Sequence, residues 1–156
     1  MIPNEEKVRR VNALTNELDR IYHRSAQRLG IPDSVLRVLY ILHERGGAAR
    51  LQDICLDSGI SKQTINSALR NLERDGILYL EPDGGRAKRV CLTETGRRFT
   101  DDTAARLYAA ESAALCGWTE EELALYQRLM EKFIRTLGEQ VDTLTPADLT
   151  SLRRTP

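Results

Sequence analysis

Residues 61–76 read SKQTINSALRNLERDG and predict a helix with one apolar and one polar side. Ser61 suits the N-cap and Gly76 the position after the C-terminus, so the helix is expected to run from Lys62 to Asp75. At 3.6 residues per turn, the inward side comprises Ile65, Ala68, Leu69 and Leu72. The outward side comprises Gln63, Asn66, Ser67, Arg70 and Arg74, with carboxylates only on its flanks. Gln and Asn can bind adenine, and Arg can bind guanine, through paired hydrogen bonds, so the outward side has the groups that recognise base edges.

The residues around this helix complete a winged helix-turn-helix pattern. A shorter helix is expected at 51–57, and Ser58-Gly59 supplies the turn between the two helices. After Gly76 the period changes, and Ile77, Tyr79 and Glu81 alternate with Leu78 and Leu80. Residues 82–85 form a turn cluster, and extended character resumes over 86–93. A β-hairpin of this size is called a wing, and its basic tip can enter the minor groove of DNA, where the negative potential is enhanced.

The predicted DNA contacts all belong to this helix and wing. They are Ser61, Lys62, Gln63, Thr64, Asn66, Ser67, Arg70, Arg74, Arg86, Lys88 and Arg89. The alternative is a generic solvent-facing helix followed by an ordinary polar hairpin tip. Most solvated helix faces mix Glu with Lys, however, and this one does not. Glu81 and Asp83 lower the positive field of the wing, so its predicted contact with DNA is local.

Further helices are predicted on both sides of this lobe. One runs from an N-cap at Asn4 to residue 29, with apolar residues three and four apart, and one at 33–45 is apolar nearly all round and therefore buried. After the wing, a helix is expected from Thr93 or Thr95 to about Cys116, and the capping box at 119–122 starts another. Thr145 is expected to cap a last short helix.

The apolar stripes on the first helix and on the helix after residue 119 exceed what a small lobe could cover, and they predict a homodimer interface. The interface residues are predicted to be Val8, Val11, Leu14, Leu18, Phe133, Leu137 and Val141. The fold class expected is mainly α with a small β-hairpin wing, in a single domain over residues 1–156. Its parts are a dimerisation helix at 1–30, a winged helix-turn-helix DNA-binding lobe at 33–93, and C-terminal dimerisation helices at 94–156. Two recognition helices about 34 Å apart predict a pseudo-palindromic operator.

Composition narrows the function classes. The formal net charge is zero, but residues 62–98 carry a net of +3 and residues 101–148 a net of −6, as expected where one face binds phosphates and another has a different task. No apolar run approaches the roughly 20 residues of a membrane span, and a cytoplasmic location is expected. Widely spaced cysteines (Cys55, Cys91 and Cys116) and no Cys/His cluster argue against a metal, and no cofactor is expected. Glycine-rich phosphate loops, acid pairs in a defined motif and nucleophile elbows are absent from the sequence, which argues against an enzyme.

The segment from Leu51 to Thr100 resembles the multiple-antibiotic-resistance regulator (MarR) family of winged-helix transcription factors. The resemblance lies in LQDICLDSGISKQTI at 51–65, LRNLERDGIL at 69–78 and RAKRVCLTETGR at 86–97, with Leu-Thr-Glu-x-Gly after a basic wing as its most specific element. It implies a homodimer through the N- and C-terminal helices, a recognition helix in the major groove, and a wing arginine, Arg86 here, in the minor groove. The chain would then be a transcriptional regulator, a repressor relieved by a small ligand. The alternative is a winged-helix module that binds another protein and no DNA.

Two details of the resemblance concern single residues. The family commonly has Asp two residues before the wing arginine, but Gly84 stands there and Asp83 is one place further back. Either Arg86 lacks the usual bracing carboxylate, or Asp83 substitutes for it. The resemblance also implies a small lipophilic or phenolic ligand between the dimer helices and the DNA-binding lobe, with Tyr22, His23, Tyr40 and Trp118 placed there by helix position. Each of these four also fits a core or interface role. Peroxide-sensing members use a cysteine in the first helix, and this chain has none before Cys55.

Overall fold

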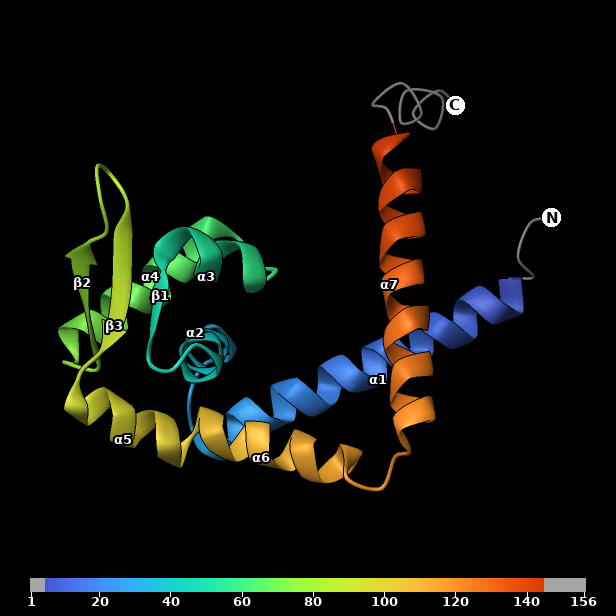
Figure 1. Cartoon of the computed structure of the whole chain (residues 1–156), viewed down its shortest axis with the longest axis horizontal. Coiled ribbons are helices and arrows are strands. Elements are labelled where there is room, and N and C mark those ends of the chain that lie inside the picture. The colour runs from blue at the N-terminus through green and yellow to red at the C-terminus, as the bar shows by residue number, and fades with distance from the viewer. Residues whose placement is uncertain (1–4, 145–156) are drawn as a thin grey trace, which may run out of the picture. The chain divides into compact units, whose positions relative to one another are not determined.

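The computed structural model describes residues 5–144. Over that range the elements, in order, are α1 (Glu5–Leu29), α2 (Asp33–Glu44), β1 (Ala48–Arg50), α3 (Leu51–Asp57), α4 (Lys62–Arg74), β2 (Leu78–Pro82), β3 (Lys88–Leu92), α5 (Glu94–Asp102), α6 (Ala104–Leu115) and α7 (Glu120–Asp142) (Figure 1). The chain divides into two compact units, residues 1–111 and 112–156. The predicted subdivision at 1–30, 33–93 and 94–156 stays a prediction. The expected N-cap at Asn4 and the helix at Thr145 lie outside the described residues.

The core of the first unit is built around α2. Its apolar residues are buried nearly all round, as predicted: Val35, Leu36, Val38, Leu39, Ile41 and Leu42. Helices α1, α3, α4 and α5 and strand β1 pack against α2, which is seen almost end-on in Figure 1. Ile54 of α3 and Ile65 of α4 are fully buried in the same cluster. The helix-turn-helix is thus held to α2 by the apolar sides of both its helices.

The expected wing hairpin is confirmed as β2 and β3, and a third strand that was not expected extends it to an antiparallel sheet with the strand order β1-β3-β2. The strand that was not predicted, β1, is only three residues long and pairs with β3, with Ala49 opposite Val90. Gly46 and Gly47, both with positive φ, lead into it, and the Gly47 carbonyl accepts a hydrogen bond from the Leu92 N–H at 2.9 Å. Three residues are too few for alternation to be recognised in sequence.

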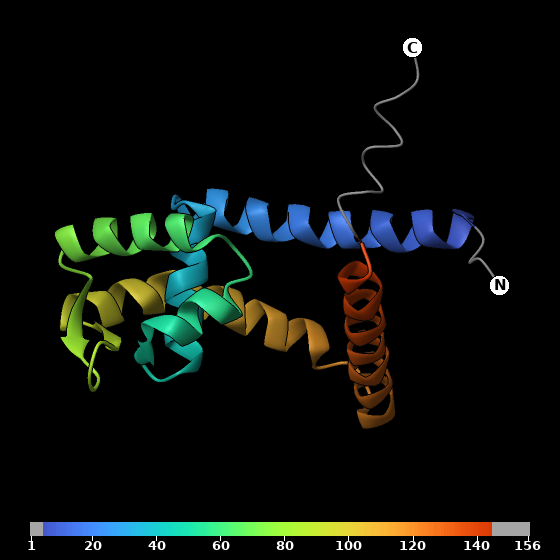
Figure 2. The ribbon, with the colours of Figure 1, turned by 90° about the horizontal axis from the view of Figure 1, so that it is seen from above.

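The single helix expected after the wing is also corrected, because it is two helices, α5 and α6, separated at Thr103. The backbone of Thr103 leaves the helical region at φ −125° and ψ −89°. Its side-chain hydroxyl donates to the Phe99 carbonyl at 2.6 Å, and its N–H bonds instead to Thr100 at 3.2 Å. Threonine hydroxyls that bond back to the preceding turn commonly bend helices. Figure 2 shows α1, by contrast, as one uninterrupted helix.

Helix α7 begins with the predicted capping box. Thr119 accepts a hydrogen bond from the Glu122 N–H at 3.2 Å, and the Glu122 carboxylate accepts one from the Thr119 N–H at 2.9 Å. No side chain of α7 is buried in the single chain. Its apolar residues nevertheless recur at helical spacing, and Phe133, Leu137 and Val141 are each about half exposed.

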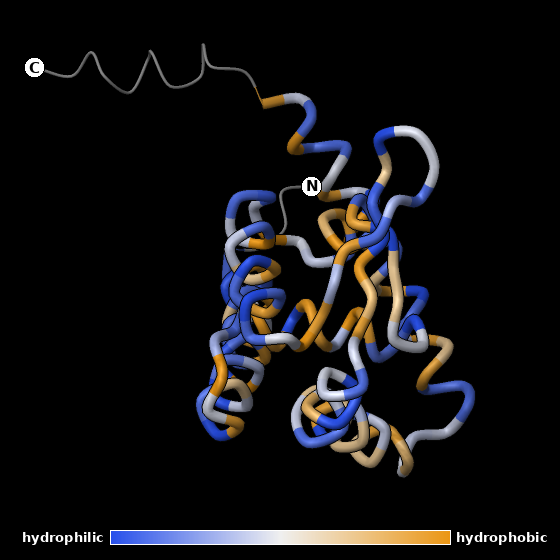
Figure 3. Tube along the Cα trace, turned by 90° about the vertical axis from the view of Figure 1, so that its left-hand side faces the viewer, coloured by the Kyte–Doolittle hydropathy of each residue, from blue (hydrophilic) through white to orange (hydrophobic). Residues whose placement is uncertain are grey.

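Helix α1 has the same character over most of its length, with Val8, Val11, Leu14 and Leu18 between 43% and 49% exposed. Figure 3, coloured by hydropathy, shows hydrophobic and hydrophilic residues alternating along the helices. None of the helices between residues 5 and 144 is long and apolar enough to cross a membrane.

Candidate nucleic-acid interface

Helix α4 presents the predicted polar side to solvent. Ser61 is its N-cap, and the Ser61 hydroxyl accepts a hydrogen bond from the Thr64 N–H at 3.1 Å. The opposite side is fixed in the core by Ile65, Ala68, Leu69 and Leu72, all buried. A helix anchored in this way cannot rotate without exposing four apolar side chains, so the direction of its polar side is set by the core.

The polar side chains of α4 are mostly free for external contacts. Lys62, Gln63, Ser67, Arg70 and Arg74 are exposed, and Asn66 is half-buried. Arg70 donates to the hydroxyl of Ser67 at 3.3 Å, and Arg74 forms an exposed ion pair with Asp75 at 3.3 Å. Exposed ion pairs of this kind are weak, so Arg74 can exchange Asp75 for a phosphate at little cost.

The wing ends in a tight turn built on two glycines. Gly84 and Gly85 have φ values of +86° and +55°, which L side chains rarely adopt. The Asp83 N–H and Ala87 carbonyl close the turn at 3.0 Å. Arg86 and Lys88 are exposed there, and neither forms an ion pair with another described residue.

Asp83 holds the base of the wing to the rest of the sheet. Its carboxylate accepts hydrogen bonds from Arg50 of β1 at 2.7 Å and from two nitrogens of Arg89 of β3 at 3.0 and 3.2 Å. The hydrogen bonds from Arg89 are the largest cause of the lowered pKa of Asp83; burial, the next in size, opposes them, and Arg50 lowers the pKa further. We call these three residues the wing clamp.

The sequence left open whether Asp83 braces Arg86. In the structure it does not, because Asp83 binds Arg50 and Arg89 instead. Arg89, a predicted DNA contact, is half-buried and already ion-paired, so it has less freedom to reach a phosphate than Arg86 or Lys88. Its role in DNA binding stays a prediction. Arg50 was not singled out in the sequence, because its strand was not recognised.

The Leu-Thr-Glu-x-Gly element joins the wing to the end of α4. The Thr93 hydroxyl donates to the Gly76 carbonyl at 2.7 Å and accepts from the Gly96 N–H at 2.9 Å. Gly96 lies against the backbone of Ile77 so closely that a Cβ added to it would be 1.8 Å from the Ile77 carbonyl oxygen. Only glycine fits this contact, which explains the spacing of the motif.

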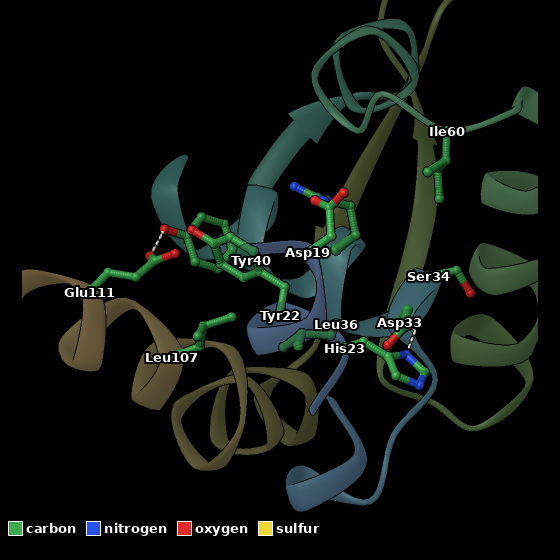
Figure 4. Close-up of a pocket in the computed structure, with 11 residues that line it drawn as sticks. Asp19, Tyr22, His23, Asp33, Ser34, Leu36, Tyr40, Ile60, Leu107 and Glu111 are labelled. Atoms are coloured by element: carbon green, nitrogen blue, oxygen red, sulfur yellow. Dashed lines mark hydrogen bonds and ion pairs between the residues drawn. The ribbon is translucent and has the colours of Figure 1, made fainter. Parts of the chain in front are cut away.

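A pocket of about 270 Å³ lies among α1, α2, α6 and the turn before α4 (Figure 4). Three of the four residues predicted for a ligand site, Tyr22, His23 and Tyr40, line it. Trp118 belongs to the second unit, where its ring contacts Tyr126 edge-on, and its place in a ligand site stays a prediction. Figure 4 shows two polar contacts in the pocket wall: Tyr40 donates to Glu111, and His23 lies 2.6 Å from Asp33.

The three cysteines are free thiols in different settings. Cys91 is buried in the sheet, Cys55 is half-buried and Cys116 is exposed. Burial, with the hydrogen bond to Glu81, raises the pKa of the Cys91 thiol. A thiol with a raised pKa is a poor nucleophile near neutral pH, so Cys91 is a packing residue.

Comparisons with known proteins identify the family that this geometry resembles. A MarR family model matches residues 29–89. A MarR family regulator from Neisseria meningitidis is similar in structure over 87% of this chain and 96% of its own, with a TM-score of 0.78 and 13% identity. The MepR–DNA complex of S. aureus matches over 81% and 94%, with a TM-score of 0.61 and 20% identity, and NadR in complex with 4-hydroxyphenylacetate over 83% and 90%, with a TM-score of 0.60 and 19% identity.

One relative in sequence is a subunit of a tRNA ligase and not a transcriptional regulator. The phenylalanine–tRNA ligase alpha subunit of Methanopyrus kandleri is 25% identical over 144 residues, which are 92% of this chain and 26% of that subunit. The chain therefore spans about a quarter of that subunit. The matched segment at 29–89 and the arrangement of helices around it confirm the resemblance: the chain has the winged-helix fold of MarR family transcriptional regulators, and its helix-turn-helix matches the model of that family.

Proposed function

We propose that the chain is a transcriptional regulator that binds a pseudo-palindromic DNA operator as a homodimer. The observation that supports this proposal most strongly is the outward side of α4, which is exposed, free of carboxylates and fixed in direction by a buried opposite side. Side chains able to bind base edges are thereby held on a rigid helix, as major-groove recognition requires. MepR, a protein of the same fold, has been solved with DNA.

The wing supplies a second contact in this proposal. Arg86 and Lys88 lie beside the glycine turn without ion-pair partners, whereas Arg89 and Arg50 are held by Asp83. Arg86 would therefore enter the minor groove, and the wing clamp would hold the base of the hairpin to β1. Shape and negative potential in a narrow minor groove attract arginine without a specific base contact.

The homodimer is supported by apolar surface that the single chain leaves exposed. The residues concerned are Val8, Val11, Leu14 and Leu18 on α1, and Phe133, Leu137 and Val141 on α7. Apolar stripes of this length on two helices are typical of obligate interfaces, which resemble a core divided in two. A second copy would also place the second recognition helix about one turn of DNA away, so the affinity of two half-sites would combine.

We further propose that a small ligand in the pocket between α1, α2 and α6 relieves repression. The pocket contains the predicted residues Tyr22, His23 and Tyr40, and it is also lined by Ile60, the residue before the N-cap of α4. NadR has been solved with 4-hydroxyphenylacetate, a small phenolic ligand.

Binding to DNA upstream of the chain's own gene tests the proposal. We expect a footprint with two-fold symmetry, and half-sites separated by about one helical turn. We also expect affinity to fall steeply with salt, since phosphate contacts release counterions. A protein that remains monomeric and does not bind this duplex at low salt would instead be a protein-binding winged-helix module, an alternative favoured by the acidic segment at 101–148.

A further inference from the structure

The pocket of the first unit carries more negative than positive charge. Its charged lining consists of the carboxylates of Asp19, Asp33 and Glu111 and the guanidinium of Arg37. A neutral His23 leaves the wall with a net charge of −2, and a protonated one with a net charge of −1. A cavity lined by one dominant sign of charge concentrates small molecules of the opposite sign.

Two donor groups in the pocket lining, those of Tyr40 and His23, already face carboxylates. The Tyr40 hydroxyl donates to Glu111, and a ring nitrogen of His23 lies 2.6 Å from Asp33. Burial and the adjacent Glu111 raise the pKa of Tyr40, so its hydroxyl keeps its proton. An anionic ligand would find neither group free to donate and would face three carboxylates, with Arg37 as its one strong partner.

One hydrogen-bond acceptor in the pocket lining has no partner among residues 5–144. The Asp19 carboxylate, on α1, makes no hydrogen bond or ion pair with any residue in the range 5–144. Asp19 lines the pocket together with the rings of Tyr22 and Tyr40, as Figure 4 shows. Tyrosine faces attract cations through their negative π surface, and a carboxylate beside them accepts hydrogen bonds from an ammonium group.

The rest of the wall suits an apolar body. Leu36 of α2, Ile60 of the turn before α4 and Leu107 of α6 line the same pocket. Sites for small molecules are commonly apolar cavities of a few hundred Å³ with a small number of polar groups that fix the ligand's orientation. The lining therefore fits a molecule with an aromatic or aliphatic body and one positive charge.

We propose that this pocket binds a small organic cation, an amine with an aromatic body, whose ammonium group faces Asp19. The ligand class departs from the phenolic acid bound by NadR, and it follows from the lining charges of this chain. The regulatory consequence rests on the proposed function, whereas the binding itself does not.

The pocket has a direct route to the DNA-binding helix. Ile60 lines the pocket and immediately precedes Ser61, whose side chain caps α4. Ser34 and Arg37 of α2 line it as well, and α2 packs against α4. A bound amine that pushes against Ile60 would favour one position of the α4 N-terminus, and a ligand shifts an equilibrium only by its difference in affinity for the two states.

Three probes with one phenol ring and different charges test the charge preference. They are tyramine, which is cationic, 2-(4-hydroxyphenyl)ethanol, which is neutral, and 4-hydroxyphenylacetate, which is anionic. Isothermal titration calorimetry with the full chain, at low ionic strength and without DNA, measures each Kd. We expect tyramine to bind about tenfold more tightly than the neutral alcohol, since a charge-assisted hydrogen bond contributes about that factor, and the anion to bind most weakly. An anion that binds most tightly, equal affinities, or no binding by any probe at millimolar concentration would overturn the proposal.

Two variants of opposite charge identify the group responsible. Asp19→Asn is expected to remove most of the preference for tyramine, whereas Arg37→Gln leaves or strengthens it. Asp101→Asn, an exposed carboxylate of α5 outside the pocket lining, is the matched control and is expected to leave all three Kd values unchanged. Circular dichroism checks that each variant is folded. Tyramine affinity that survives Asp19→Asn in a folded protein refutes the assignment of the ammonium to Asp19.

The test of tyramine binding and the test of DNA binding can fail independently of each other. Tyramine binding without any duplex binding would retain the pocket and remove the regulator. Duplex binding without tyramine binding would retain the regulator and remove the cation site. If both occur, tyramine and not 4-hydroxyphenylacetate is expected to change the operator affinity.

Discussion

Gly96→Ala tests the contact on which the joint between the wing and α4 depends. An alanine methyl at this position would be 1.8 Å from the Ile77 carbonyl oxygen, 2.9 Å from the Ile77 carbonyl carbon and 3.3 Å from Leu92 Cδ2. The oxygen belongs to the backbone, so it cannot rotate away as a flexible side chain would. To restore an ordinary contact, the start of α5 and the backbone before β2 must separate by more than 1 Å.

The expected free-energy change follows from two opposing contributions. Overpacking of a core contact costs about 1–3 kcal/mol, and the displaced Ile77 carbonyl also loses its hydrogen bond from the Thr93 N–H, worth about 1 kcal/mol. Alanine favours a helix over glycine by roughly 0.5–1 kcal/mol, which offsets part of this cost. We therefore expect Gly96→Ala to destabilise the protein by about 2 kcal/mol, or about 4–8 °C in Tm for a chain of this size.

Gly138→Ala is the matched control because Gly138 is also helical, in α7, and a Cβ added there meets nothing within 4 Å. The control should raise stability by up to about 1 kcal/mol through helix propensity. Thermal and urea unfolding followed by circular dichroism, at one fixed protein concentration, measures both variants. A Gly96→Ala protein as stable as the parent, or more stable, would refute the close packing of α5 on the Ile77 backbone.

The remaining predictions concern DNA binding and assembly. Arg70→Ala is expected to cost about 1–3 kcal/mol in operator affinity and to relax the base preference at one position, and an equal loss on all sequences would reduce Arg70 to a phosphate contact. Arg86→Ala should weaken binding and lower the salt slope by about one, and an unchanged affinity would exclude the wing. Leu137→Glu should yield monomers that no longer bind the operator, and sedimentation as a dimer would refute the proposed interface. Asp83→Asn should loosen the wing clamp and weaken operator binding with little loss of fold. Because the pKa of Asp83 is lowered, the clamp of the parent protein is expected to persist above the ordinary pKa of aspartate. It is expected to fail only as the pH falls below that value. Operator titrations at pH 5 and 8 check the last point, and a clamp effect that disappears at pH 5 would contradict it.

The helices could be predicted because their signals are local. Ser61, the apolar residues of α4 and the capping box at Thr119 all act within about four residues, which is the range over which periodicity and capping operate. The apolar surround of α2 is similarly visible in its own sequence. These patterns were sufficient for the helix-turn-helix and for the outward side of α4.

The missed features depend on partners that are distant in sequence. Strand β1 exists because β3 pairs with it, and nothing in Ala-Ala-Arg distinguishes a strand from a loop. Arg50 and Asp83 are 33 residues apart, and Tyr40 and Glu111 are 71 residues apart. The break at Thr103 depends on whether one hydroxyl bonds back to Phe99, which helix propensity alone does not decide.

Helix α4 is held at its two ends by different parts of the same unit, and this has a consequence for regulation. At the C-terminal end, Thr93 binds the Gly76 carbonyl and Gly96 packs on Ile77, so the wing and this end form one rigid piece. At the N-terminal end, Ser61 caps the helix and the preceding residue, Ile60, lines the pocket. A ligand in the pocket would touch Ile60 directly and reach the rest of α4 only through α2, so α4 would tilt mainly about its C-terminal joint. Lys62 and Gln63 would then move more than Arg74, so a ligand should weaken contacts made by the start of α4 before those made by the wing.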